Sequence, residues 1–192
     1  MKDLRHIFIV LLTLFWIKTE AQPIFGVYFN SNDFVNNRLS FTSSKNKKCK
    51  IKSHEFPYKD YIIVKCDGNS LRFYKDSIFG YKDLNEINYR FYNKVIYTIL
   101  NPGEQILLYS TETIISGAKN PVIINHYFFS KDASSEIFPL TINNILEIFK
   151  SNVIFCEWVE IHFKNESDLV EYDPTHKIYK LNRLLQLSTT PN

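Results

Sequence analysis

The chain has 192 residues, a formal net charge of +3 at pH 7 and 45% hydrophobic residues. A charge this small excludes a general electrostatic affinity for nucleic acid, and the apolar content excludes an intrinsically disordered chain. Only five glycines occur and none forms a Gly-rich phosphate loop, which excludes the simple nucleotide-binding classes.

The N-terminal residues 1–21 predict a cleavable secretory signal peptide. A basic start precedes an apolar run from Ile7 to Ile17, which as a helix would cover roughly 16 Å of the about 30 Å of hydrocarbon in a bilayer. A small-x-small pattern ends at Ala21, so the mature chain is expected to begin at Gln22. A buried N-terminal strand and an uncleaved anchor remain as alternatives. The predicted destination is export, either to the periplasm or into the medium.

The mature chain, residues 22–192, is long enough for one globular domain with a substantial core. Residues 22–139 are rich in strand signals, and residues 140–192 carry helical patterns. Turn signals at Asp67-Gly68 and Asn93-Lys94 indicate antiparallel hairpins. The expected strands are Ile24–Phe29, Lys48–Ser53, Tyr61–Cys66, Ser70–Tyr74, Ile78–Tyr81, Ile87–Tyr92, Val95–Leu100, Gln105–Thr111 and Val122–Ser130.

Two cysteines flank a pair of these strands. If residue 51 lies opposite residue 64 in an antiparallel pair, Cys49 faces Cys66, and export makes a disulfide between them chemically accessible. The third cysteine, Cys156, lies in an apolar helical stretch and is expected to pack as a small hydrophobe.

Five lysines crowd into eight residues around the first of these cysteines: Lys45, Lys47, Lys48, Lys50 and Lys52. Such a run could form a patch for an anionic surface or polymer. No aromatic residue interleaves with the lysines, which favours instead a solvated loop that leads into a lysine-guarded edge strand.

Three helices are expected in the C-terminal part. Thr141 is a candidate N-cap, Val153–Phe163 is apolar around most of its circumference and should be well buried, and Asp173-Pro174 is typical of the start of a third helix. The predicted fold class is therefore α+β, an antiparallel β-meander with about three C-terminal helices packed on it. Strong curling of the sheet is left open.

Two stretches carry a resemblance to a known group of proteins. The first is Ile24-Phe25-Gly26-Val27-Tyr28 followed by Asp33-Phe34. The second is Ile78-Phe79-Gly80-Tyr81, which leads into Tyr89-Arg90-Phe91-Tyr92 and the hairpin Ile96–Tyr109. Together they resemble small exported proteins of Bacteroidota with no assigned activity. The resemblance implies a cell-envelope or secreted setting and transfers no catalytic residue.

Reactive constellations are scarce. His126, His162 and His176 are candidate general bases only if one of them lies beside a carboxylate in an open cleft. A pairing of Cys156 with a histidine is disfavoured, because burial in an apolar helix raises the pKa of a thiol. An acidic cluster offers oxygen ligands for calcium, although the EF-hand order is missing; its members are Glu166, Asp168, Glu171 and Asp173. No metal or cofactor is expected.

The leading functional hypothesis is an exported, non-enzymatic module that binds an envelope or extracellular partner. Aromatic-rich strands can provide adhesive surfaces for such a role. The alternatives are a carrier of a small apolar ligand in a curled sheet and a hydrolase with an unrecognised site. No nucleic-acid partner is expected, and no membrane span is expected after removal of the signal peptide.

The cleavage site is directly testable. Expression in a bacterial host followed by intact-mass analysis of the exported protein should give the mass of residues 22–192, beginning at Gln22. The substitution Ala21→Arg should cause the precursor to accumulate, because the peptidase requires a small residue there. Export of the full-length chain with its N-terminus intact would contradict the prediction.

Overall fold

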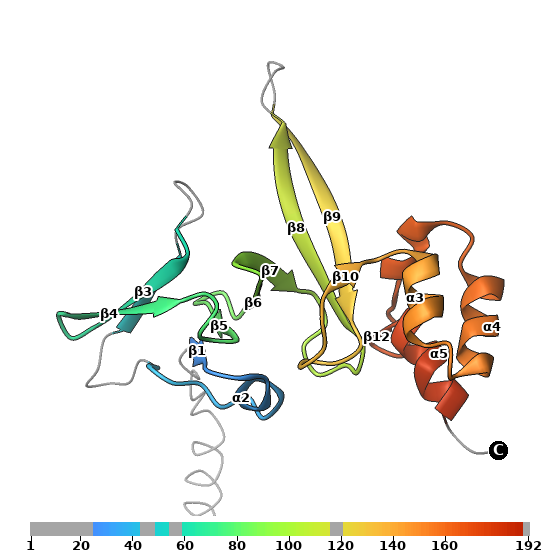
Figure 1. Cartoon of the computed structure of the whole chain (residues 1–192), viewed down its shortest axis with the longest axis horizontal. Helices are drawn as coiled ribbons and strands as arrows, with labels where there is room; N and C mark the ends of the chain where they lie inside the picture. Colours follow the sequence, from blue (N-terminus) through green and yellow to red (C-terminus); the bar gives the residue numbers. More distant parts are fainter. Residues whose placement is uncertain (1–24, 43–48, 54–58, 116–120, 190–192) are drawn as a thin grey trace, which may run out of the picture.

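The structure is a computed structural model, and it describes residues 25–42, 49–53, 59–115 and 121–189. The predicted signal peptide, including Ala21 and Gln22, lies outside the described residues. The fold class is α+β with antiparallel sheets, as predicted. The main sheet is neither closed nor strongly curled, so the curling that the sequence left open does not occur (Figure 1).

The described residues form a main sheet of seven strands in the order β1-β5-β6-β7-β8-β9-β10. Its central hairpin turns at Asn93 and Lys94, whose φ values of 48° and 66° are those that a two-residue turn needs. From β5 onward, neighbours in the sheet are neighbours in sequence, which is the predicted meander. The strands are β1 (Gly26–Tyr28), β5 (Gly80–Lys82), β6 (Asn88–Tyr92), β7 (Val95–Ile99), β8 (Leu107–Ile115), β9 (Val122–Ser130) and β10 (Phe138–Pro139).

A separate sheet of three strands is inserted between β1 and β5: β2 (Cys49–Lys52), β3 (Tyr61–Cys66) and β4 (Asn69–Tyr74). Its buried residues Ile62 and Val64 pack against Val27, Tyr81 and Phe91 of the main sheet. The sequence predicts these strands but not their separation from the meander. The separation depends on the pairing of β1 with β5, which local patterns do not reveal.

The register between β2 and β3 is the predicted one, with Ile51 opposite Val64. The same register places Cys49 opposite Cys66, and the structure joins their sulfur atoms in a disulfide. The bridge therefore closes one end of the three-stranded sheet across two adjacent strands.

The C-terminal helices are α3 (Ile142–Ile148), α4 (Val153–His162) and α5 (Lys180–Thr189), and a short helix α2 (Ser31–Val35) follows β1. Thr141 caps α3 as predicted, since its hydroxyl accepts a hydrogen bond from the Asn144 amide at 3.2 Å. No helix in the described part of the chain is long and apolar enough to cross a membrane.

The predicted start of the third helix at Asp173-Pro174 is wrong. A 3-10 helix (Glu166–Val170) is followed by a small hairpin, β11 (Tyr172–Asp173) and β12 (Ile178–Tyr179), and α5 begins only after it. The carboxylate of Asp173 accepts hydrogen bonds from the amides of Thr175 and His176, so it caps a turn between two strands. An Asx turn and a helix N-cap use the same side-chain chemistry, which is why the sequence does not separate them.

The expected burial of the second C-terminal helix is also wrong. Only Phe155 and Val159 of α4 are buried, whereas Val153, Ile154 and Ile161 are exposed. The helix lies at the outer side of the helical layer (Figure 1), so one stripe of its apolar circumference packs inward and the remainder faces solvent.

The helical layer packs on the inner half of β8 and β9. Ile106, Leu108 and Phe129 from this region form one core with the buried residues of α3, α4 and α5. A residue of α5 that the sequence does not single out, Asn182, fixes this contact. Its amide accepts a hydrogen bond from the Ile106 N–H and donates one to the Ile106 carbonyl, both at 2.8 Å.

Asn101 completes this arrangement from the turn before β8. Its amide nitrogen donates to the Ile106 carbonyl at 2.8 Å, and its amide oxygen accepts from the Leu108 N–H at 2.7 Å. Both asparagines are buried. Two side-chain amides therefore supply, at the backbone of Ile106 and Leu108, the hydrogen bonds that a neighbouring strand would otherwise make. We call this set of contacts the asparagine clamp.

Arg90 fixes the middle of the main sheet. It is only 5% exposed, and its guanidinium donates to the Tyr109 hydroxyl at 2.7 Å, to the Ser130 hydroxyl at 3.2 Å and to the Ser135 carbonyl at 2.7 Å. No carboxylate of the described residues lies within ion-pair distance, but the ring of Phe79 lies 5.3 Å away and provides cation–π contact. The arginine thus ties β6 to the base of β8 and β9.

Removing the helix side of the clamp should be costly. The substitution Asn182→Ala leaves the buried Ile106 N–H without its partner, and we expect the free energy of unfolding to fall by about 1–3 kcal/mol. Urea unfolding of both proteins measures the difference. The control Leu187→Ala, on the same helix but half-exposed, should change stability by less than about 0.5 kcal/mol. Equal losses in the two variants would contradict the role of the clamp.

Candidate functional site

The candidate site is the outer part of the β8–β9 hairpin, which we call the arm. It consists of the cross-strand pairs from Thr111↔His126 to Ile115↔Val122. Figure 1 shows the arm projecting away from the rest of the molecule. β7 and β10 pair only with the inner parts of β8 and β9. Within the described residues, both edges of the arm therefore lack a neighbouring strand.

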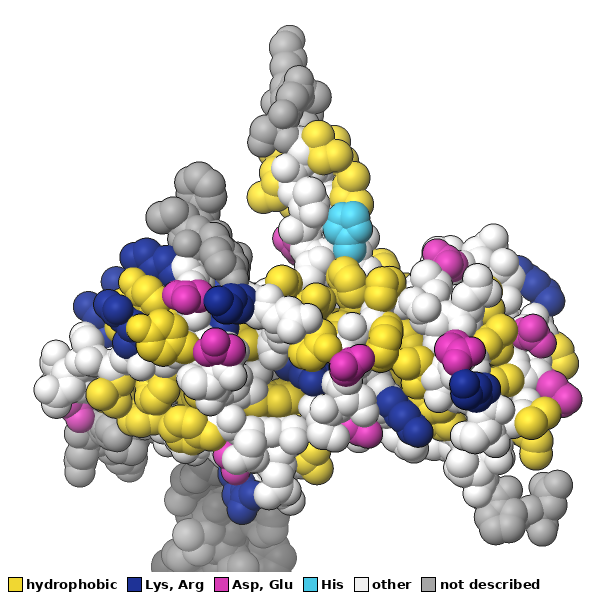
Figure 2. Space-filling view, viewed as in Figure 1, with side chains coloured by type: hydrophobic (Ala, Val, Ile, Leu, Met, Phe, Trp, Pro, Cys, Tyr) yellow, Lys and Arg dark blue, Asp and Glu magenta, His cyan; other side chains and the backbone are white. Residues whose placement is uncertain are grey.

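Both faces of the arm expose β-branched apolar side chains. Directly opposite residues of an antiparallel pair share a face, so Ile114 and Ile123, exposed by 61% and 57%, lie together on one side. Ile115, Val122 and Ile124 are exposed on the other side. Figure 2 shows hydrophobic side chains gathered toward the end of the arm. An apolar cluster that covers two faces of a projecting element is typical of a contact surface.

The edge of β9 carries none of the devices that natural proteins use to protect exposed strands. Its arm residues, Val122–His126, include no lysine, arginine, aspartate, glutamate, proline or glycine. The edge strand β2 of the same molecule exposes Lys50 and Lys52, as the sequence interpretation expects of a guarded edge. The remaining lysines of that run lie outside the described residues. The contrast indicates that the edge of β9 in the arm is open to pairing with another strand.

Sequence reasoning identified the second strand of the arm but not its exposure. The predicted strand Gln105–Thr111 carries apolar residues on both faces, which is typical of a strand covered on two sides. Only the inner residues of β8 are covered in this way. The candidate general base His126 lies on the arm, and its side chain is exposed. The available signal was the apolar run Val122–Ile124 without polar alternation, which is equally typical of a buried strand.

The other candidate histidines lie at the C-terminal end. His176 Nδ1 donates a hydrogen bond to the Asp173 carboxylate at 2.8 Å, and Arg183 contacts the same carboxylate oxygen. A cleft of about 300 Å³ beside this cluster is lined by His162, Asp173, Lys180, Arg183 and neighbouring apolar residues. No serine, threonine or cysteine is among its lining residues, and His176 is not among them either. A histidine–carboxylate pair is therefore present, but no hydroxyl or thiol nucleophile lines the cleft with it.

The acidic cluster does not converge on a common point. Asp168 accepts the Asn165 N–H in a capping box, Glu171 pairs with Lys180 at 2.5 Å, and Asp173 is held as described above. Among the described residues, no group of three or more His, Cys, Asp or Glu side chains is placed to hold a metal ion. The carboxylates have separate structural partners.

Cys156 packs as expected. Its thiol is partly buried and donates to the Phe149 carbonyl at 3.3 Å. Burial raises the pKa of the thiol, and the nearby Glu160 raises it further. The thiolate needed for nucleophilic chemistry is thus disfavoured.

Comparison with protein-family models, with curated protein sequences and with solved structures gives no significant match. The function must therefore be inferred from the geometry of the chain itself.

The Asp173 cluster predicts a pH-dependent contribution to stability. Burial raises the pKa of Asp173, but hydrogen bonds from His176 and Arg183 outweigh it and lower the pKa from 3.8 to about 2. A lowered folded-state pKa stabilises the fold above pH 3.8, and this contribution is lost as the pH falls toward about 2. We expect Asp173→Asn to lower the melting temperature at neutral pH.

The difference between Asp173→Asn and the wild type should shrink as the pH falls toward about 2, where Asp173 itself becomes protonated. Thermal unfolding followed by circular dichroism across this range measures it. Glu147→Gln, which removes an acid from an exposed ion pair on α3, is the control and should have little effect at any pH. A wild-type advantage that persists undiminished at the lowest pH would contradict the assignment.

Proposed function

We propose that this chain is an exported binding module whose contact surface is the arm, and that its partner is an extended, uncharged protein segment that pairs with the edge of β9. The single observation that carries the proposal is the combination of apolar residues on both faces with two edges that lack a strand neighbour in the described chain. Strand addition uses both features, because backbone groups pair along the edge and apolar side chains pack above and below it.

The charge pattern supports an uncharged partner. Glu112 carries the one formal charge of the arm, and it lies on β8 rather than on β9. A charged side chain placed opposite Ile123 or Ile124 would lose hydration without gaining an ion pair. An uncharged strand rich in apolar residues therefore complements β9 best.

A lipid bilayer is a less favourable partner. The N–H and C=O groups along two unpartnered edges are hydrated in water, and insertion into hydrocarbon would leave them without hydrogen bonds. Pairing with a strand replaces each lost water contact with a backbone hydrogen bond. The geometry of the arm thus favours a protein partner.

The two alternative functions have less support. A carrier with its ligand inside a curled sheet requires a curvature that the main sheet does not have. A hydrolase would use His176 beside Asp173, yet the residues that line the adjacent cleft include no serine, threonine or cysteine to serve as its nucleophile. The resemblance to exported proteins of Bacteroidota is compatible with the proposed module and remains a prediction.

Site-specific photo-crosslinking tests the proposal in the exporting cell. A benzophenone amino acid at position 123 should give a discrete adduct that mass spectrometry identifies. The same probe at position 161 is the control, since Ile161 on α4 is exposed to a similar extent, 62% against 57% for Ile123. The position-161 probe should give no comparable adduct.

The substitution Ile123→Lys should reduce the adduct formed from a probe at position 114 by about tenfold, because a cation on the apolar face opposes burial. Its melting temperature should match that of the wild type, since the side chain is exposed. An adduct that consists of two copies of this chain would identify the partner strand as β9 of a second molecule. Equal labelling at positions 123 and 161 would count against the arm as the contact surface.

A further inference from the structure

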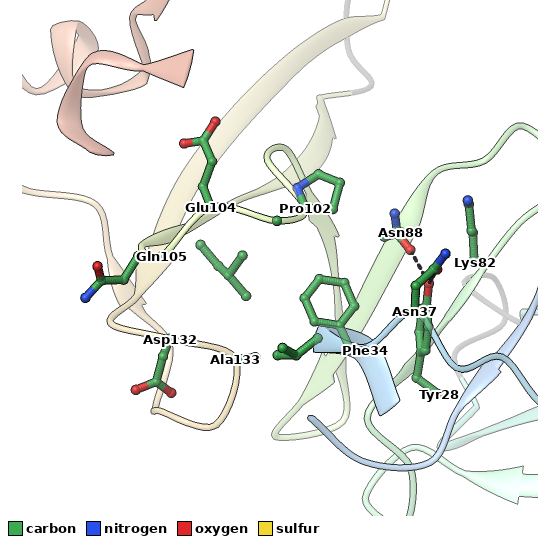
Figure 3. A pocket seen from close by; sticks show the side chains of 13 residues that line it. Tyr28, Phe34, Asn37, Lys82, Asn88, Pro102, Glu104, Gln105, Asp132 and Ala133 are labelled. Atoms are coloured by element: carbon green, nitrogen blue, oxygen red, sulfur yellow. Dashed lines mark hydrogen bonds between the residues drawn. The ribbon is translucent and has the colours of Figure 1, made fainter. Parts of the chain in front are cut away.

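A second feature, independent of the arm, is a pocket between α2, the turn that follows β7 and the turn that follows β9 (Figure 3). Its volume is about 520 Å³. This lies within the roughly 300–1,000 Å³ typical of small-molecule sites. The sequence analysis did not predict it, because its lining residues come from five separate segments of the chain. They are Tyr28, Phe34, Val35, Asn37, Lys82, Asn88, Pro102, Gly103, Glu104, Gln105, Leu107, Asp132 and Ala133.

One part of the pocket is a rigid apolar wall. Phe34, Leu107 and Ala133 are buried and belong to one core cluster. The ring of Phe34 stacks on Phe79 with centroids 5.0 Å apart and meets the Tyr28 ring edge-on at 5.4 Å. Contacts on two sides hold this ring in place, so the wall is formed before any ligand arrives.

The opposite part of the pocket is rich in hydrogen-bond donors. The Tyr28 hydroxyl lies 2.9 Å from the amide oxygen of Asn88 and 3.1 Å from that of Asn37, and its single proton is shared between these two acceptors. Because these contacts use the amide oxygens, the two amide nitrogens remain as donors. Figure 3 shows Asn37, Asn88 and Lys82 gathered on one side of the pocket near Tyr28. Burial raises the pKa of Tyr28 to about 12, so its hydroxyl keeps its proton at neutral pH.

Lys82 supplies a positive charge to the same side. Its side chain is only 15% exposed, and the carboxylate that pairs with it, Glu86, is 4.0 Å away and largely exposed. Because this ion pair is long and its carboxylate is exposed to solvent, Glu86 neutralises the charge of the Lys82 ammonium only weakly. The ammonium group therefore retains capacity for an anion at the pocket.

The two acidic residues of the lining are already engaged elsewhere. The Asp132 carboxylate accepts hydrogen bonds from the Ser134 amide and hydroxyl and from the Ser135 amide. The Glu104 carboxylate is held by Asn101 and by the Tyr179 amide. Figure 3 shows both carboxylates directed away from the pocket. On the side of the pocket near Tyr28, the polar groups that remain available to a ligand are therefore the amide donors and one cation.

We propose that this pocket binds a small organic carboxylate with an apolar body. The carboxylate accepts hydrogen bonds from Asn37 and Asn88 and pairs with Lys82, while the apolar body packs on Phe34 and Leu107. A neutral molecule of the same shape would leave the cation unpaired, and an amine would place two positive charges together. The proposal requires neither the arm nor its partner.

Calorimetric titration of the mature protein with three probes of equal length tests the chemistry. Octanoate should bind at least tenfold more tightly than octanamide, a difference of about 1.4 kcal/mol, and octylamine should bind least. Lys82→Met should weaken octanoate binding by about tenfold and leave octanamide unchanged. The control Lys150→Met removes an exposed lysine just after α3 and should leave all three affinities unchanged.

A variant that fills the pocket tests its location. Val35 is exposed by 69% at the pocket and makes no core contact, so Val35→Trp should preserve the melting temperature while abolishing octanoate binding. The proposal is overturned if folded wild-type protein does not bind octanoate, if octylamine binds equally well, or if Val35→Trp binds as the wild type does.

Discussion

The position of the arm depends on the asparagine clamp at the start of β8. Two buried side-chain amides, from Asn101 and Asn182, hold the backbone of Ile106 where a flanking strand would otherwise pair. A strand buried without such partners would leave polar groups unsatisfied in the core, at a cost of a few kcal/mol. Because the clamp satisfies these backbone groups, the first residues of β8 can lie in the core next to helices. The later residues of β8 then leave the core as one strand of the hairpin with β9.

The arm begins where other elements of the structure cease to pack against β8 and β9. Helical side chains cover Leu108 and Phe129, and Arg90 ties Tyr109 and Ser130 to β6. Beyond Ser110 and Tyr127 no described strand pairs with β8 or β9, so the ladder continues with exposed residues on both faces. A rigid base and an uncovered end are the two properties that strand addition requires, since an ordered edge loses little conformational entropy on pairing. The edge strand β2 of the same chain is protected instead, because it carries a disulfide and exposed lysines.

Much of the local structure could be predicted. The turn residues Asn93 and Lys94, the Thr141 cap and the register that brings Cys49 to Cys66 follow from local backbone preferences and the two-residue period of strands. The start of α5 could not, because the carboxylate of Asp173 caps a turn as readily as a helix. The separate three-stranded sheet and the pocket also escaped prediction, because both depend on contacts between segments distant in sequence.

The sequence by itself determined most of the strands, the approximate positions of the first two C-terminal helices, and how adjacent strands pair. Only the tertiary structure decided which apolar residues are covered. Val122–Ile124 and Leu107–Tyr109 are similarly apolar, yet the first is exposed and the second is buried. A residue's hydrophobicity is a property of its side chain, but its burial depends on which other segments reach it. The same chemistry therefore produces a core at the base of one hairpin and a contact surface at its end.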